Sequence, residues 1–180
     1  MPTRDEGSRQ RRFGAFLILV LLMRSDDAGG SDGSESSETI VVARAEALPA
    51  SLVAAVKNAA ARLGSPGCRE IFSDFHDGQG NTLQQNLDAL GVTGAFYLQW
   101  TLFYDGTGSR LCERRNILAA TAPGSRSVFV CMAQFLEVAR REPRLASALV
   151  IHEELHSLGL GENPPDSKTI TARVLARCGQ

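Results

Sequence analysis

The sequence predicts a single α+β domain, in which a small, mostly antiparallel sheet packs against a helix carrying a His-Glu-x-x-His motif. Three observations lead to this fold class. A chain of 180 residues accommodates one hydrophobic core. Helical periodicity occurs in both halves of the chain, and short aromatic and β-branched runs occur in the middle.

Composition narrows the classes of partner. The net charge of −1 and the aromatic content of 6% argue against a nucleic acid or an anionic membrane surface as the partner. Hydrophobic residues make up 43% and charged residues 22%, as in ordinary globular proteins. We therefore expect a monomer that binds no nucleic acid.

The first 30 residues have the order of a secretory signal peptide. A basic run (residues 9–12) precedes an apolar run (13–23) and a small-residue region (28–30). The apolar run is shorter than the roughly 20 residues that span a bilayer. We expect residues 1–30 to be removed and the protein to be secreted or periplasmic. The acidic pair Asp26-Asp27 disturbs the cleavage region, so an uncleaved N-terminal membrane anchor is the alternative.

Residues 31–39 are polar, acidic and rich in glycine and serine, which predicts a disordered linker before a domain spanning 40–180. The domain should begin with an amphipathic helix between Pro49 and Gly64. Its apolar face comprises Leu52, Val53, Val56, Ala59 and Ala60. A short helical turn and a helix near residues 82–90 should follow.

The middle of the chain predicts the sheet. Residues 94–106 are aromatic and apolar and end in the turn signal Asp105-Gly106, residues 111–120 can return as a partner strand, and residues 125–132 form a short buried strand. Either Ala95–Tyr104 or Leu111–Ala120 can supply the sheet edge nearest the motif. A helix over 133–142 and a helix from Pro143 to about Leu158 complete the fold.

All four cysteines lie after the predicted cleavage point, and an even number in an exported chain predicts two disulfides. Three pairings are possible. We expect Cys68–Cys112 and Cys131–Cys178, because the second would tie the chain end to the sheet. Buried free thiols are the alternative.

The stretch "IHEELH" carries the chemistry. Residues four apart lie on one face of a helix, so His152 and His156 can both direct an imidazole at one metal ion. Glu153 stays outside the ligand set and can accept a proton from a water molecule. The motif therefore predicts a site for one zinc ion, with Glu153 as its general base.

A zinc site also needs a third protein ligand and one position open to water. Gly159 can adopt the left-handed conformation that ends a helix and turns the chain back. Glu162 follows three residues later, ten residues after His152, and we expect it to be the third ligand. Asp166 is the reserve candidate.

The sequence "HEELHSLGLGE" resembles the metzincin signature of zinc metallopeptidases, with glutamate in the place of the final histidine. "VFVC" and "IHEELHSLGLGENPP" are also similar to segments of small exported bacterial proteins. The resemblance covers residues 127–178 and implies a zincin-like domain with His152, His156 and Glu162 on zinc and Glu153 as base. Two departures separate the chain from metzincins: the third ligand is not histidine, and no methionine follows the motif.

Other polar residues receive structural interpretations. We expect Glu154 to face solvent or a neighbouring arginine, Tyr97 and Tyr104 to pack in strands, and His76 to lie on the surface. Oxyanion stabilisation by the tyrosines and metal binding by His76 are the functional alternatives. The arginines of residues 140–144 should form a solvated face with nearby glutamates.

These features lead to two hypotheses of different classes. The first is an exported zinc metallopeptidase that acts on a peptide or protein substrate. The second is a non-catalytic secreted binding module that a metal ion braces. The fourth coordination position distinguishes them, because a structural site would fill it with Asp166, His76 or a cysteine.

Overall fold

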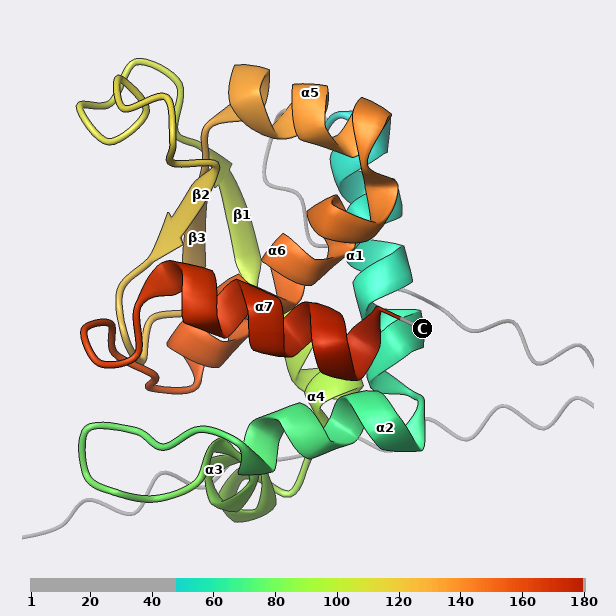
Figure 1. The fold of residues 1–180 in the computed structure, drawn as a ribbon, viewed down its shortest axis with the longest axis vertical. Coiled ribbons are helices and arrows are strands. Elements are labelled where there is room, and N and C mark those ends of the chain that lie inside the picture. The colour runs from blue at the N-terminus through green and yellow to red at the C-terminus, as the bar shows by residue number, and fades with distance from the viewer. Residues whose placement is uncertain (1–47, 180) are drawn as a thin grey trace, which may run out of the picture. The chain divides into compact units, whose positions relative to one another are not determined.

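Helix α6 (Pro143–Ser157) is the central element of the domain and is buried along its whole second half. We analysed a computed structural model, which describes residues 48–179. Four elements pack on α6 (Figure 1): α1 (Ala50–Leu63), β2 (Ala119–Thr121), α5 (Met132–Arg141) and α7 (Ser167–Cys178). The described residues belong to one compact unit that combines helices with a small sheet. The predicted α+β class is therefore confirmed.

The predicted helices begin and end where their capping residues indicate. Helix α1 lies between Pro49 and Gly64 as expected, and Pro143 occupies the first turn of α6. Thr82 begins α3 (Leu83–Leu90) with a reciprocal capping box, and Gly91 ends it at a φ of 68°. The predicted turn after Gly64 is also helical, in two short pieces: α2 (Pro66–Arg69) and η1 (Glu70–Ser73).

The aromatic segment 94–106 is only partly a strand, which corrects our prediction. Its first half is helical, as α4 (Gly94–Tyr97) and η2 (Leu98–Trp100). The Thr93 side chain accepts a hydrogen bond from the Phe96 backbone N–H and so caps α4. Strand β1 (Leu102–Asp105) contains the remaining residues and ends at the predicted turn. A local cap therefore prevails over the β propensity of the aromatic residues.

The sheet is mixed rather than mostly antiparallel. Its order is β1-β3-β2, with β3 (Ser127–Val130) in the centre. Strand β3 is parallel to β1 and antiparallel to β2. The predicted return strand over 111–120 is therefore wrong in two respects, because it is reduced to residues 119–121 and pairs with β3 instead of β1. A long loop crosses from β1 to the far edge of the sheet, so the two edge strands do not meet (Figure 1).

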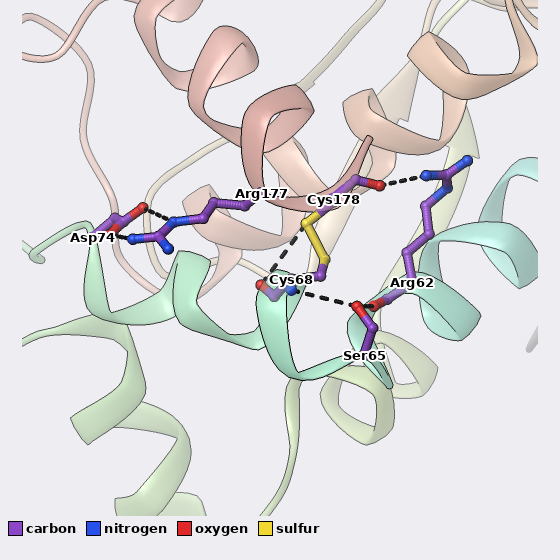
Figure 2. Close-up of a disulfide and its surroundings, with 6 residues drawn as sticks. All are labelled: Arg62, Ser65, Cys68, Asp74, Arg177 and Cys178. Atoms are coloured by element: carbon purple, nitrogen blue, oxygen red, sulfur yellow. Dashed lines mark hydrogen bonds and ion pairs between the residues drawn. A yellow bond between two sulfur atoms is a disulfide. The ribbon is translucent and has the colours of Figure 1, made fainter. Parts of the chain in front are cut away.

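The C-terminal helix α7 was not predicted, and it determines the disulfide pairing. Helix α7 brings Cys178 back to α2, where it pairs with Cys68 (Figure 2). The second disulfide joins Cys112 in the β1–β2 loop to Cys131 at the end of β3. Our expected pairing, Cys68–Cys112 and Cys131–Cys178, is therefore wrong. The alternative of free thiols is also wrong, since residues 48–179 contain none.

The predictions for the N-terminal part fall outside the described residues. The signal peptide or anchor (1–30), the linker (31–39) and the first residues of the expected domain all precede Leu48. Within the part of the chain that the structure describes, no helix combines the length and apolar character needed to span a membrane.

Candidate metal centre

The three predicted ligands converge on one point. The Nε2 atoms of His152 and His156 lie 3.0 Å apart. Oε1 of Glu162 lies 3.8 Å from the first of these nitrogens and 3.4 Å from the second. Both imidazoles are buried on α6, whereas the Glu162 side chain is 41% exposed at the mouth of the site.

These spacings suit a tetrahedral metal ion. With bonds of about 2.0–2.1 Å, a zinc ion holds neighbouring ligand atoms about 3.3 Å apart. The three measured separations lie on either side of that value. Two imidazoles and one carboxylate thus offer ligand atoms that all lie within 4.8 Å of one another. This donor set fits zinc better than calcium or magnesium, which prefer oxygen ligands throughout.

The end of α6 orients His156. The Leu160 N–H bonds to the Leu155 carbonyl at 3.1 Å and the Gly159 N–H to the His156 carbonyl at 2.9 Å, which is the Schellman pattern. The Leu160 carbonyl then lies 2.7 Å from Nδ1 of His156. Because a carbonyl can only accept, Nδ1 carries the proton and Nε2 offers its lone pair to a metal.

The same chain reversal delivers Glu162. Gly159 has a φ of 110°, so the predicted positive φ at this position is confirmed. A Cβ at this glycine would lie 3.1 Å from the Cβ of Asp77, a tight contact that Asp77 would have to shift to relieve. Asn86 fastens the turn by donating hydrogen bonds to the Leu158 carbonyl and to Asp77. Conformation and close packing therefore both require glycine here.

His152 is oriented from a different element. Its Nδ1 lies 3.0 Å from the Thr171 hydroxyl on α7, so its Nε2 also faces the cluster. Burial, together with the neighbouring His156, lowers the pKa of His152 to about 3. A ring that remains neutral at physiological pH keeps the lone pair that metal binding needs.

Glu153 lies beside the cluster without joining it. The side chain is buried, and its Oε2 has no hydrogen-bond partner among the described residues. The pKa of Glu153 is raised to about 7, mainly by burial and to a smaller extent by the Glu162 carboxylate, while the Thr121 hydroxyl acts in the opposite direction. A carboxyl group with a pKa near neutrality can both accept and release a proton at physiological pH.

A cleft of about 480 Å³ brings these groups together. His152, Glu153, His156 and Glu162 line one side of it. Edge strand β2 and the loop before it line the other, so residues 119–121 form the sheet edge nearest the motif. Of the two edges considered from the sequence, the structure therefore places the later segment, and not β1, beside the candidate ligands.

The remaining candidates lie elsewhere. Asp166 caps α7, where its carboxylate accepts a hydrogen bond from the Thr169 N–H at 2.7 Å. His76 is exposed in a loop and pairs with Thr82 in a β-bridge.

The hydroxyl of Tyr97 lies 3.0 Å from that of Ser157, and exposed Tyr104 stacks on Phe129. As predicted, Glu137 forms surface ion pairs with Arg140 and Arg141.

Glu154 corrects a prediction. Instead of facing solvent or an arginine, it is 0% exposed, and neither carboxylate oxygen has a hydrogen-bond partner among residues 48–179. Glu154 does not line the cleft and lies against α4 instead, where a Cβ on Gly94 would be 3.4 Å from its Oε1. Burial raises its pKa well above the usual range.

Sequence reasoning missed the groups that support the ligands. Thr171 belongs to the helix that was not predicted, although apolar Ile170, Val174 and Cys178 repeat at helical spacing after Asp166, which is a good capping residue. The Leu160 carbonyl carries no sequence signal beyond the following chain reversal. No family model, curated protein or solved structure matches the chain.

Proposed function

We propose that the protein is an exported zinc-dependent peptidase, with His152, His156 and Glu162 as metal ligands and Glu153 as general base. The observation that carries the proposal is the buried carboxylate of Glu153, which has an unpartnered oxygen and shares one cleft with the three-ligand cluster. A purely structural metal site has no need of such a base. Bound zinc would lower the pKa of its water to about 7 and polarise a substrate carbonyl.

The composition of the cluster favours an enzyme over a metal-braced module. A structural zinc site uses four protein ligands, whereas a catalytic one uses three and leaves a position for water. Residues 48–179 supply three converging groups. The groups that could fill the fourth position are engaged in other contacts: Asp166 caps α7, His76 pairs with Thr82 in a β-bridge, and all four cysteines are in disulfides.

The edge of β2 offers a place for an extended peptide. The Cys131 N–H bonds to the Leu118 carbonyl at 2.9 Å, so in this antiparallel ladder Ala120 also faces β3. Ala119 and Thr121 then direct their backbone N–H and C=O groups to the free edge of the sheet. A substrate can bind there as an added strand, with a carbonyl held above the cluster.

The chain's own residues divide the chemistry among them. Glu153 accepts the proton of the attacking water and passes it to the departing amine. Thr171 and the Leu160 carbonyl keep the imidazoles oriented. The apolar packing around α6 excludes bulk water from the base.

The test is Glu153→Gln, which preserves the shape of the side chain and removes the base. We expect this variant to retain zinc, measured as metal content of the purified protein, and to lose at least about a hundredfold in peptide hydrolysis. Glu154→Gln is the matched control, because its carboxyl is buried on the same helix but does not line the cleft. Full hydrolysis by Glu153→Gln would reject Glu153 as the general base and so the proposed mechanism, and zinc bound without any hydrolysis by the wild type would favour the braced module.

A further inference from the structure

The cleft also carries an apolar wall that the proposed chemistry does not use. We infer that the β1–β2 loop, residues 106–118, selects polypeptide segments with a large apolar side chain next to the bond to be cleaved, and that Cys112–Cys131 holds this selecting wall in place. The inference rests on the proposed function, because it names the substrate class of the same cleft.

The loop directs its few apolar side chains into the cleft. Most of its residues are glycine, hydroxyl-bearing or charged, and Glu113–Asn116 are exposed. Leu111 and Ile117 are half-buried, and both line the cleft. The loop has no hydrophobic core of its own, so the apolar surface that these two side chains present is best covered by a ligand side chain.

The opposite wall places this apolar surface beside the reacting groups. Leu149 lies three residues before His152 on α6, hence on the same helical face, and it also lines the cleft. On β2, Ala119 and Ala120 project only methyl groups, which leaves volume between the loop and the helix. A large aliphatic or aromatic side chain can fill that volume while its backbone pairs with β2.

Charge in the cleft gives no support for recognition of a C-terminal chain end. The ionisable residues lining it are the two histidines, Glu153 and Glu162, and none of the described lining residues is lysine or arginine. The residues lining the cleft therefore offer a substrate's terminal carboxylate no lysine or arginine to pair with. The apolar wall is therefore the feature of the cleft that can select a substrate.

The disulfide is the main attachment of the loop. The two ends of the loop are tied to the sheet by backbone hydrogen bonds, from the Gly106 N–H to the Val130 carbonyl and from the Cys131 N–H to the Leu118 carbonyl. The backbone hydrogen bonds within the loop only close local turns. In the middle of the loop, Cys112 bonds covalently to Cys131, and its carbonyl accepts a hydrogen bond from Gln134 on α5 at 2.8 Å. Loss of the disulfide should free Leu111 and Ile117 while leaving the metal ligands on α6 in place.

The test measures binding separately from hydrolysis. Zinc-loaded Glu153→Gln protein is titrated with two fluorescent peptides whose ends are blocked. The peptides are identical except at one position, which is Leu in one and the similarly shaped but polar Asn in the other. We expect the Leu peptide to bind about tenfold or more tightly than the Asn peptide, and an unblocked C-terminal carboxylate to give no gain. When Ile117→Asn is combined with Glu153→Gln, we expect the preference for the Leu peptide to fall to about twofold, because the apolar wall has lost one of its side chains.

Leu90→Asn is the matched control, since Leu90 is exposed and lies outside the cleft, and it should preserve the preference. Cys112→Ala with Cys131→Ala should weaken the preference with zinc content unchanged, measured where circular dichroism shows a folded protein. Equal binding of the two peptides, or an unchanged preference in Ile117→Asn, would overturn the inference. Selective binding without hydrolysis by the wild type would reject the peptidase alone, and hydrolysis without selectivity would reject this inference alone.

Discussion

Thr171 supplies the hydroxyl that orients one of the two imidazoles of the proposed metal site. It lies 3.0 Å from Nδ1 of His152 and comes from α7, whereas the histidine belongs to α6. Thr171→Val removes the hydroxyl and keeps the branched shape. We expect zinc affinity to fall by about tenfold or more, because groups that orient metal ligands typically contribute that much. A competition titration with a chromophoric chelator measures the change.

Thr171→Ser is the control for this prediction, since it retains the hydroxyl and should restore most of the affinity. Both variants should keep the far-ultraviolet spectrum of the wild type. Identical zinc affinity for Thr171→Val and the wild type would mean that His152 is held by packing alone.

The residues of the HExxH motif and their convergence could be predicted from the sequence, and the groups that orient them could not. His152, Glu153 and His156 belong to a local motif whose helical spacing determines their relative positions. Thr171 reaches the same site from 19 residues away, through helix packing that no local pattern encodes. Glu154 illustrates the converse limit, because a charged residue type predicts exposure, but here the neighbouring helices cover it completely.

Gly159 ends α6 and carries the chain back to the third ligand. Its φ of 110° and the 3.1 Å that would separate an added Cβ from Asp77 both oppose any larger residue. We expect Gly159→Ala to lower the free energy of unfolding by about 1–3 kcal/mol, as strained backbone positions do. Zinc affinity should also fall by about tenfold or more, since the turn positions Glu162 and the Leu160 carbonyl.

Urea denaturation and zinc competition measure the two effects. Gly161→Ala is the matched control, because a Cβ there meets nothing within 4 Å and its φ is not positive. If the two alanine variants behave alike, the turn does not depend on the conformation of Gly159.

Three helices with clear caps and the central strand β3 were predictable as elements, whereas the topology of the sheet was not. Pro49, Thr82 and Pro143 mark helix starts that the structure confirms. The strands have only three or four residues, too few for a period-two pattern to fix their ends, although β3 lies within the predicted strand over 125–132. Their order and direction depend on where the β1–β2 loop crosses, which is a tertiary property.

The C-terminal helix closes the domain through contacts between distant parts of the chain. Cys68–Cys178 links residues 110 apart, Arg62 donates to the Cys178 carbonyl, and the Arg177 guanidinium donates two hydrogen bonds of 2.7 and 2.8 Å to Asp74 (Figure 2). Such pairings are long-range, so counting cysteines predicted two disulfides but could not choose their partners. The same closure positions Thr171 against His152.

The Asp74–Arg177 pair makes part of this closure dependent on pH. Hydrogen bonding to Arg177 holds the pKa of Asp74 below its usual value of 3.8 in the folded protein. Because the pKa of Asp74 is lower in the folded than in the unfolded protein, its charge stabilises the fold fully at pH values above the unfolded-state pKa. This stabilisation is lost as the pH falls through the folded-state pKa. We expect the wild type to exceed Asp74→Asn by about 1 kcal/mol in free energy of unfolding at pH 7.

That difference should shrink steadily below pH 4, as measured by urea denaturation at pH 7 and at pH 3. Arg177→Gln, alone and combined with Asp74→Asn, completes a double-mutant cycle that isolates the pair. A wild-type advantage of the same size at both pH values would show that the charge of Asp74 is not what stabilises the closure.

The proposed site depends most directly on one ion bound by two histidines and an acid from the following turn. Titration of metal-free protein with zinc, in competition with a chelator, measures both stoichiometry and affinity. We predict one zinc ion per chain, an affinity reduced by about tenfold or more in Glu162→Ala, and an affinity unchanged in Asp166→Asn, which keeps the cap of α7. No saturable zinc binding, or equal affinity in Glu162→Ala and the wild type, would contradict the three-ligand centre.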